Sequence, residues 1–404
     1  MNPPILLSGI DNLLNDPALV NELKTRRFGY VGHPASTTSD LIHGIDALVF
    51  SHLTPVAAFG PQHGMRGDKQ DNMVESRDYI DDIHGIPVYS LYGEHRRPTP
   101  SMLEGMDTIL FDLQDIGCRI YTFLTTLVYF MEACAHQGID FWILDRPNPA
   151  GRKVEGLTLI SGQESFVGCD QIPMRHGLTL GEFAFWYKSR HALNLDLKVI
   201  RMKNYSPGEA PGFGWPLGVR PWINPSPNAS SLNMARCFPG TVLLEGTELS
   251  EGRGTTTPLE ILGAPDLPMK EIMMRMDQLA PAWIQGVKIR SSFFEPTFHK
   301  HQGQLCTGFQ LHTDFDGFDP DTFSPFRLVS LFLKSLRLTR PEYAIWRYHQ
   351  YEYELDRIPI DVINGSSLLR EWVDDNDASV ADLEALLQKD EREWLEQSLA
   401  LRIY

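Results

Sequence analysis

Cysteines are few in this sequence and show no metal-binding arrangement. The chain has five among 404 residues, and no two are spaced as CxxC. They are Cys118, Cys134, Cys169, Cys237 and Cys306. An odd number of scattered cysteines is typical of reduced thiols, so we expect a cytoplasmic protein without a disulfide framework. HExxH is also absent and the histidines show no zinc-like grouping, so no metal is expected.

Basic residues are outnumbered by acidic ones. Lysine and arginine total 36 against 52 aspartates and glutamates, which gives a net charge of −16 with histidine neutral. A phosphate-binding surface needs concentrated positive charge, so no nucleic-acid partner is expected. Apolar residues make up 42% and charged residues 22%, which is ordinary for a globular protein and excludes a disordered chain.

The sequence has no hydrophobic run long enough to cross a bilayer. The longest apolar stretch, residues 124–135, contains Glu132 and is far shorter than the ~20 residues that a membrane helix needs. The N-terminal apolar run is short, no basic segment precedes it, and Asp11 and Asp16 follow it. We therefore expect neither a membrane partner nor a signal peptide.

Three common catalytic or nucleotide-binding motifs are missing as well. No GxGxxG opens a helix after a strand, and neither GxxxxGK[ST] nor GxSxG occurs. These absences disfavour dinucleotide binding, nucleotide phosphate binding and a nucleophile elbow, and no cofactor is expected. Any chemistry must come from carboxylates, amides, arginines and histidines around a crevice.

Short apolar runs alternate with helical patterns in the first half of the chain. We predict strands at residues 28–31, 54–59, 86–91, 108–113, 141–144 and 195–202, and helices at residues 40–50, 100–106, 120–136 and 178–190. Strands that alternate with helices favour a parallel sheet covered on both faces.

Polar loops follow the first five of these predicted strands. They read GHPAS (32–36), GPQHGMRG (60–67), YGEHRRP (92–98), QDIGCR (114–119) and DRPNP (145–149). In an open parallel sheet such loops gather at the carboxyl edge, where ligands bind in the crevice. Turn chemistry explains their Gly, Pro and Asn but not Gln-His, Arg-Arg or Asp-Arg, so these loops indicate a functional site.

The length favours two domains, and residues 206–228 are rich in Pro and Gly with Trp215 and Trp222. We place the junction there, which gives an N-terminal domain of residues 1–228 and a smaller α+β domain of residues 229–404. In the second domain we predict a strand and a Gly-rich loop within 239–258, a helix at 270–279, strands at 287–294 and 307–311, and a helical tail from Ser379.

Seven carboxylates stand out as candidates for acid and base chemistry. They are Glu75, Asp112, Asp115, Asp145, Glu182, Glu245 and Glu251. Two carboxyl groups that flank a glycosidic oxygen can supply the acid and the base of sugar hydrolysis. Each can instead cap a helix or pair with an arginine, and the residues alone leave both readings open.

Other polar side chains in the loops can likewise have either a functional or a structural role. Arginines near Gly, Pro or His are Arg66, Arg119, Arg146, Arg175 and Arg253. A guanidinium there can bind a carboxylate ligand bidentately or pair with an aspartate of the chain. Trp215 and Trp222 can stack on a sugar or pack between domains. Tyr121 needs a partner if buried, and His63 and His176 can relay protons or be simply hydrogen-bonded.

Several long motifs occur in a fixed order along nearly the whole chain. They are GPQHGMRG, VYSLYGEHRRPTP, DLQDIGCRIYTF, DRPNPAGR, MRHGLTLGE, PSPN, FPGTVLLEGTELSEGRGTTTPLEILGAP and FHKHQGQLCTGFQ. Together they resemble the exo-β-N-acetylmuramidase (NamZ-type) family of glycoside hydrolases, formerly a domain of unknown function.

The resemblance implies an α/β fold: a Rossmann-like, doubly wound, mostly parallel sheet without a nucleotide, and a second, smaller α+β domain that completes a cleft. It implies exo-acting removal of β-linked N-acetylmuramic acid from the non-reducing end of peptidoglycan-derived fragments, without a metal. The expected partner is a small glycan or muropeptide. The residues expected in catalysis are Gln62, His63, Asp115 and Glu251. Those expected to bind substrate are Arg66, Arg119, Tyr121, Asp145, Arg146, Asn148, His176, Asn228, Glu245 and Arg253.

One position departs from the family pattern. The family's Pro-Glu-His-Gly motif carries the glutamate thought to be catalytic, and this chain has Gln62 there, between Pro61 and His63. An amide has no carboxyl proton to give. Three alternatives follow: another carboxylate such as Glu75, Asp115 or Glu251 supplies the proton, the protein cleaves a different acidic sugar, or it binds glycans without cleaving them.

Overall fold

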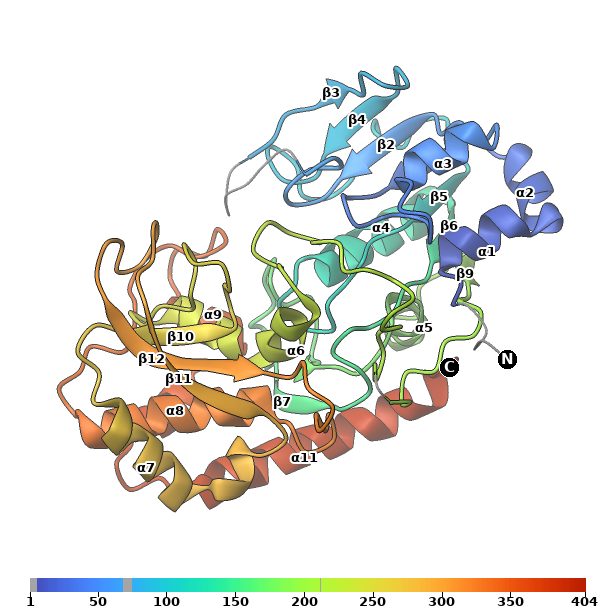
Figure 1. The fold of residues 1–404 in the computed structure, drawn as a ribbon. Helices are drawn as coiled ribbons and strands as arrows, with labels where there is room; N and C mark the ends of the chain where they lie inside the picture. Colours follow the sequence, from blue (N-terminus) through green and yellow to red (C-terminus); the bar gives the residue numbers. More distant parts are fainter. Residues whose placement is uncertain (1–5, 68–74, 211) are drawn as a thin grey trace.

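A computed structural model describes residues 6–67, 75–210 and 212–404, and its first half is built around a seven-stranded sheet (Figure 1). The strands are β1 Phe28–Val31, β2 Ala57–Gly60, β3 Tyr79–Ile80, β4 Pro87–Ser90, β5 Thr108–Phe111, β6 Asp140–Leu144 and β9 Leu197–Ile200. Their order across the sheet is β3-β4-β2-β1-β5-β6-β9, and every pair is parallel except β3 with β4. The chain thus winds outward from β1 in both directions, which puts a topological switch point between β1 and β5.

Helices cover both faces of this sheet. They are α1 Gly9–Asn15, α2 Pro17–Lys24, α3 Gly44–Phe50, α4 Phe123–Gln137 and α5 Leu180–Arg190. Alternate strand residues enter two separate cores: Leu110 packs with side chains of α1, α2 and α3, whereas Ile109 and Phe111 pack with those of α4 and α5. Because successive strand residues point to opposite faces, burial of both sets makes the sheet doubly wound, as predicted.

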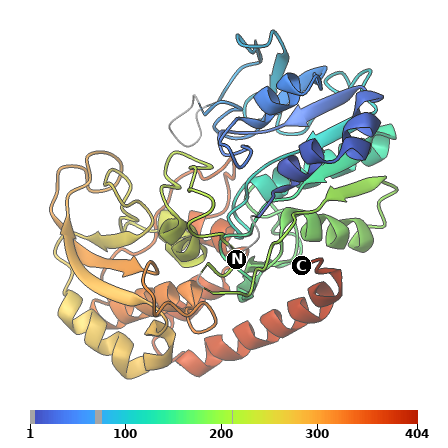
Figure 2. The ribbon, with the colours of Figure 1, turned by 45° about the vertical axis from the view of Figure 1, so that its right-hand side comes forward.

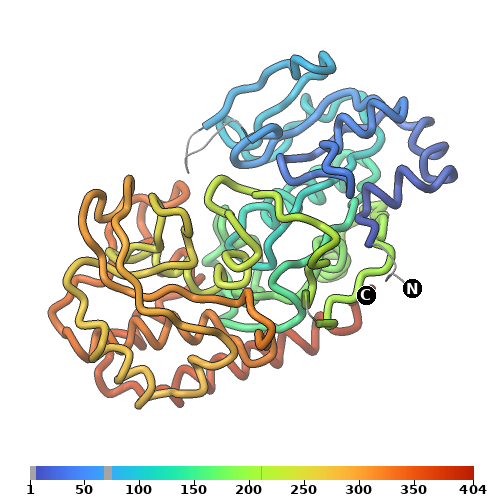
Figure 3. The backbone as a smooth tube through the Cα atoms, viewed as in Figure 1, coloured from blue at the N-terminus to red at the C-terminus, as the bar shows by residue number. Residues whose placement is uncertain are grey.

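The second half holds a smaller antiparallel sheet and most of the remaining helices. Strand β12 (Cys306–His312) lies between β10 (Ile261–Ala264) and β11 (Lys288–Phe294). The helical segments are α6 Leu232–Thr241, η1 Val242–Gly246, α7 Met269–Leu279, η2 Pro281–Ile284, α8 Pro325–Thr339, α9 Pro359–Asn364 and α10 Leu368–Asp374. Figure 3 shows this half as a separate lobe, in yellow to red, beside the blue and green lobe of the parallel sheet. The α/β fold with a second, smaller α+β unit agrees with the sequence-based prediction.

The C-terminal helix connects the two lobes. Helix α11 (Val380–Ser398) lies beneath both of them in Figures 1 and 2, and η3 (Leu399–Leu401) follows it. It packs against β7 (Glu155–Thr158), which pairs with β8 (Pro173–Arg175) in a small separate sheet. The indole ring of Trp394 lies 4.9 Å from that of Trp186 on α5. These contacts fix the relative position of the lobes and therefore the geometry of whatever lies between them.

Two local predictions are wrong. Residues 100–106 form turns instead of a helix, and the strand predicted within 239–258 is the end of α6 followed by η1. The run from Val242 to Leu244 is buried on all sides, so its apolar pattern could not distinguish a strand from a buried helical segment. No helix among residues 6–67, 75–210 and 212–404 is long and apolar enough to cross a membrane.

Candidate active site

Segments from both lobes meet in a narrow pocket beside the carboxyl edge of the parallel sheet. The N-terminal lobe contributes the loop after β2 and the residues before α4, and the second lobe contributes α6, η1 and the segment between α8 and α9. The polar residues lining it are Gln62, His63, Tyr121, Thr122, Ser226, Asn228, Glu245, Arg253, Tyr351 and Glu352. Its volume is about 60 Å³, which is room for a few water molecules but not for a sugar ring.

The loop after β2 places Gln62 at the wall of this pocket. A Cβ atom on Gly60 would lie 2.7 Å from the backbone nitrogen of Met65, so only glycine allows the chain to turn back so tightly there. The Gln62 side chain is buried, and its Oε1 accepts a hydrogen bond from Thr122 Oγ1 at 3.0 Å. Its Nε2 donates to Glu352 Oε1 at 3.5 Å. The amide is therefore oriented with its N–H group toward a carboxyl group.

Glu352 lies in a strained segment and is almost fully buried. Its φ is +44° and that of Tyr353 is +72°, a region that non-glycine residues avoid and that is often found at functional sites. The hydroxyl of Tyr92 donates to Glu352 Oε2 at 3.1 Å. Burial raises the pKa of Glu352 to about 7; the Tyr92 hydrogen bond opposes this rise, and the nearby charge of Glu245 adds to it. This carboxyl group is thus partly protonated near neutral pH.

Glu245 is the second carboxylate that lines the pocket, and its surroundings differ. Its Oε1 accepts from Arg253 Nη2 at 2.6 Å, and its Oε2 accepts from the hydroxyl of Tyr351 at 2.7 Å. A guanidinium in direct contact stabilises the ionised form of a carboxylate. The pocket therefore presents one carboxyl group paired with a cation and one, Glu352, for which the described part of the chain offers no ion pair.

Glu251, expected to be catalytic, is fully buried behind Arg253. Its Oε2 accepts from Lys300 Nζ at 2.8 Å, and Arg253 Nε lies 3.2 Å from its Oε1. Burial would raise the pKa of Glu251, but Lys300 and Arg253 outweigh burial and hold it at about 2. Glu251 is therefore ionised at neutral pH and has no proton to give. The structure does not bring it to the pocket surface.

Asp115 and His176 lie together, also outside the pocket lining. Asp115 Oδ2 accepts from the backbone N–H of Gly117 at 2.6 Å and lies 3.6 Å from His176 Nε2. His176 is fully buried, and its Nδ1 accepts from the backbone N–H of Leu178. These contacts shape the loops after β5 and β8.

The remaining predicted binding residues stabilise the first lobe or connect it to the second. Arg66 pairs with Asp46 and Asp81, and Arg146 pairs with Asp112 at 2.7 Å. Arg119 donates to four backbone carbonyls, of Leu157, Ile172, Ile363 and Asn364. Asp145 accepts from Thr179, Gly181 and Tyr404. Asn148 bonds to the backbone of Ala150 and Leu178.

The structure brings six of the fourteen predicted site residues to one pocket. They are Gln62, His63, Tyr121, Asn228, Glu245 and Arg253. Sequence reasoning missed Glu352, Tyr92, Thr122 and Tyr351. Glu352 lies in a Tyr-Glu-Tyr-Glu run that matches no known catalytic motif. The only sequence feature that could have singled it out is the tyrosine on each side of it. Trp215 and Trp222 pack on each other, with ring centroids 4.9 Å apart.

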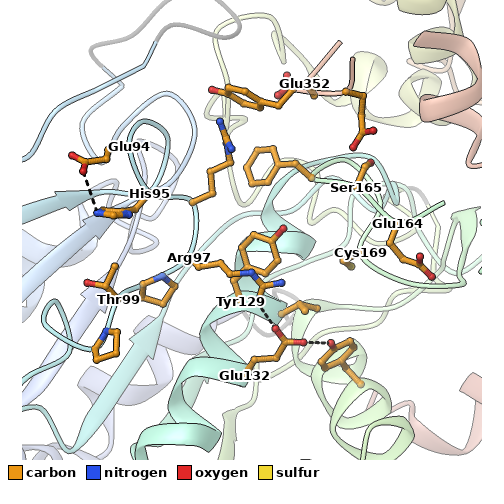
Figure 4. Close-up of a pocket in the computed structure, with 18 residues that line it drawn as sticks. Glu94, His95, Arg97, Thr99, Tyr129, Glu132, Glu164, Ser165, Cys169 and Glu352 are labelled. Atoms are coloured by element: carbon orange, nitrogen blue, oxygen red, sulfur yellow. Dashed lines mark hydrogen bonds and ion pairs between the residues drawn. The ribbon is translucent and has the colours of Figure 1, made fainter. Parts of the chain in front are cut away.

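A larger pocket of about 720 Å³ adjoins the narrow one, and Glu352 lines both. Figure 4 shows Glu352 at one end of this larger pocket and Glu132 at the other. Arg97 pairs with Glu132 and stacks 3.6 Å from the ring of Tyr129. This pocket has the size expected of a small-molecule site.

Arg96 also lines the larger pocket, and its guanidinium lies 3.1 Å from the ring centroid of Tyr353. Arg96 Nε is buried and has no hydrogen-bond partner among the described residues, whereas the hydroxyl of Tyr353 interacts with that of Tyr92. Buried donors are normally satisfied, so the Nε–H of Arg96 is an unmet hydrogen-bonding group at the wall of the larger pocket. Among the residues that the structure describes, no cluster of His, Cys, Asp or Glu side chains is placed to hold a metal ion.

Comparisons with known proteins give a consistent result. The models of the N-terminal and C-terminal domains of exo-β-N-acetylmuramidase NamZ match residues 28–233 and 236–404. The chain is 41% identical over 319 residues to peptidoglycan β-N-acetylmuramidase NamZ of Bacillus subtilis strain 168, covering 78% of this chain and 75% of that protein.

Two solved structures of DUF1343 family proteins from Bacteroides fragilis have the same fold. One is 29% identical with a TM-score of 0.83 and full coverage of both chains. The other is 25% identical with a TM-score of 0.76 and covers 99% of each chain.

Proposed function

The chain belongs to the exo-β-N-acetylmuramidase NamZ family, and we propose that it is an exo-acting glycoside hydrolase that removes β-linked N-acetylmuramic acid from the non-reducing end of peptidoglycan-derived fragments. The observation that carries this proposal is a pair of neighbouring pockets that share Glu352 in their walls. The larger has room for a monosaccharide, and Glu352 lies between it and the polar narrow pocket.

The charges around the larger pocket support an acidic sugar as substrate. Muramic acid carries a lactyl carboxylate, and a planar guanidinium binds a carboxylate through two parallel hydrogen bonds. Arg253 is already occupied by Glu245 and Glu251, whereas Arg96 has a buried Nε–H without a partner in the described structure. Arg96 is therefore our candidate for the carboxylate-binding residue.

The size difference between the pockets supports a division of roles. A sugar ring with its acetamido and lactyl groups fits the larger pocket, and the narrow pocket holds water beside Tyr121, Asn228 and Ser226. In this arrangement the glycosidic bond lies next to Glu352, where water can reach the anomeric carbon. We retain Gln62, His63, Tyr121, Asn228, Glu245 and Arg253 as site residues on this basis.

A second candidate function is glycan binding without cleavage, and the amide of Gln62 is the observation that favours it. Release of the chromophore from a chromogenic β-N-acetylmuramide separates the two candidates. Release by the native protein supports the hydrolase. Release by the Gln62→Glu variant alone supports a binding protein. Absence of release by either, together with tight binding of another acidic sugar, contradicts the proposed substrate.

We also propose that the enzyme acts in the cytoplasm on recovered cell-wall fragments. All five cysteines are free thiols, which is typical of proteins in a reducing compartment.

We further propose a domain boundary between residues 228 and 229. The family models divide the chain close to this boundary, between residues 233 and 236.

A further inference from the structure

We propose that Glu352 is the general acid of this enzyme, the group that gives its proton to the glycosidic oxygen, and that Gln62 and Tyr92 orient its carboxyl group. This inference rests on the proposed hydrolase function and names the residue that performs its proton transfer. Three observations support it: the position of Glu352 between two pockets, its hydrogen-bond partners, and the different surroundings of the other carboxylates.

The position of Glu352 is the first observation. Among the described residues it alone lines both the pocket of about 720 Å³ and the narrow pocket of about 60 Å³. A proton donor must lie within hydrogen-bond reach of the leaving oxygen, and that oxygen lies at the boundary between the bound sugar and the rest of the substrate. Glu352 reaches this boundary from a backbone with φ +44°, a strained conformation that the surrounding structure must stabilise.

The partners of Glu352 are the second observation. Both of its oxygens accept from neutral groups, Oε1 from the Gln62 amide and Oε2 from the Tyr92 hydroxyl. Neutral donors hold the carboxyl group in place without the strong stabilisation of the anion that a cation in contact would give. Burial raises its pKa to about 7, and a general acid works best when its pKa is near the working pH.

Several charged or titratable side chains surround Glu352 and affect its proton. Arg96 favours the anionic form, and Glu245 disfavours it because two like charges repel. The other charged or titratable side chains that line the two pockets or bond to Glu352 are His63, Tyr92, Glu94, His95, Arg97, Tyr121, Tyr129, Glu132, Glu164, Cys169, Tyr187, Arg253, Tyr351, Tyr353 and Glu354. Burial is the largest cause of the raised pKa of Glu352, and the charge of Glu245, which is paired with Arg253, adds to it, so Glu352 is partly protonated near neutral pH.

The other carboxylates are the third observation. Glu251 is ionised between Lys300 and Arg253, and Asp115 lies outside the lining of both pockets. Glu75 is exposed and lines separate surface depressions with Arg77 and Asp78. Of the carboxyl groups that line the narrow pocket, Glu352 is therefore the one that can carry a proton to the substrate.

The proposed step is balanced in atoms and electrons. The proton moves from Glu352 to the glycosidic oxygen while the bond between that oxygen and the anomeric carbon breaks, and the oxygen keeps the electron pair. A water molecule adds its oxygen to the anomeric carbon and releases one proton to solvent, and Glu352 takes up a proton from solvent before the next cycle. The products are free N-acetylmuramic acid and the shortened glycan, and no co-reactant other than water is consumed.

The test compares two substrates in the native protein and in Glu352→Gln. The disaccharide N-acetylmuramyl-β-1,4-N-acetylglucosamine has a poor leaving group that needs protonation, whereas a 4-nitrophenyl β-N-acetylmuramide has a good one that needs little. We expect the variant to lose ~100-fold or more in kcat on the disaccharide and much less on the nitrophenyl substrate. Glu342→Gln is the matched control, because Glu342 is exposed, pairs with Arg340 at 3.0 Å and lines neither pocket, so its activity should stay unchanged.

The pH profile gives an independent readout. On the disaccharide, whose leaving group needs the proton, kcat/KM of the native protein should fall as pH rises through about 7, and the residual activity of Glu352→Gln should lack this decline. If Glu352→Gln does not fold, Tyr92→Phe decides the question. It keeps the carboxyl group but removes the hydroxyl that lowers its pKa, so the decline should move to higher pH.

The possible outcomes distinguish a failure of the proposed acid role of Glu352 from a failure of the proposed hydrolase function. A native protein that cleaves the disaccharide while Glu352→Gln cleaves it equally fast overturns the role of Glu352 but leaves the hydrolase intact. Equal losses on both substrates, or an unmoved pH profile in Tyr92→Phe, overturn it as well. A native protein that cleaves neither substrate contradicts the hydrolase function and the acid role together.

Discussion

The side-chain amide of Gln62 donates a hydrogen bond to the carboxyl group of Glu352, which is 290 positions away in the sequence. The opposite end of the amide accepts from Thr122, so its N–H group is directed at Glu352 and not away from it. A neutral donor thus faces Glu352 at the position where the family resemblance led us to expect a carboxyl group. Two adjacent carboxyl groups would share one proton, whereas in this pair only Glu352 can hold it, because Gln62 is an amide.

Placing a carboxyl group at position 62 should change the pH dependence of the enzyme. In Gln62→Glu two carboxyl groups lie at hydrogen-bond distance, and the anion of one disfavours ionisation of the other. We expect the alkaline decline of kcat/KM on the disaccharide N-acetylmuramyl-β-1,4-N-acetylglucosamine to move up by ~1 pH unit or more. Gln302→Glu makes the same chemical change at an exposed position and should leave the profile where it is. An unchanged profile in Gln62→Glu would mean that Glu352 does not control it.

The raised pKa of Glu352 also predicts how stability depends on pH. The pKa is about 7 in the folded protein and ~4.3 in the unfolded chain, so the folded state binds the proton more tightly. The resulting stabilisation is complete below pH ~4 and is lost as pH rises to about 7. Glu352→Gln has no such proton, so its stability relative to the native protein should increase over this range, by at most ~4 kcal/mol.

Urea unfolding at pH 4.5, 6 and 7.5 measures this difference directly. The gain of the variant should appear between the first and the last pH and should not grow further at pH 8.5. A constant difference between the two proteins across the whole range would contradict the raised pKa.

The sequence was sufficient for the sheet because its signals are local. Residues 28–31 and 108–111 are short apolar runs ended by polar loops, and both form the predicted parallel strands. The loop after β2 could be placed at the carboxyl edge for the same reason, since strand direction fixes where each loop emerges. The position of α11 beneath both lobes had no such signal, because it depends on contacts such as Trp394 with Trp186.

Most of the site could not be predicted because burial and long-range contacts decide what a polar residue does. Arg119 resembles a ligand-binding loop arginine in sequence, yet it is fully buried and bonds four backbone carbonyls. Glu352 has no motif, and its role depends on a positive φ and on partners from the other lobe. Neither property follows from neighbouring residues in the chain.

The contacts of Glu251 predict a stabilising role for this residue. Lys300→Met should lower the free energy of unfolding by ~3–5 kcal/mol, because it removes the 2.8 Å partner of a fully buried carboxylate. The double variant Glu251→Gln with Lys300→Met should recover part of this loss, since no unpaired charge remains. Denaturant unfolding of the two single variants and the double variant completes the cycle. Additive losses would show that the two side chains do not interact.

Arg96 provides a prediction about which part of the sugar the larger pocket recognises. Its buried Nε–H lacks a partner in the described structure, and a charged hydrogen bond to a lactyl carboxylate contributes ~1.5–3 kcal/mol. Arg96→Gln should therefore weaken inhibition by N-acetylmuramic acid by ~10-fold or more and leave inhibition by N-acetylglucosamine, which has no lactyl group, nearly unchanged.

Arg96→Lys keeps the charge but loses the planar fork, so its inhibition constant for N-acetylmuramic acid should lie between those of the native protein and Arg96→Gln. The ring of Tyr353 stacks on the Arg96 guanidinium, so a substitution of Arg96 could act by displacing this ring. The comparison of the two sugars detects such an effect. A displaced ring would weaken both sugars to the same degree, because both present the same pyranose and acetamido groups. Equal weakening would therefore assign Arg96 a packing role, and the carboxylate would have to be bound elsewhere in the pocket.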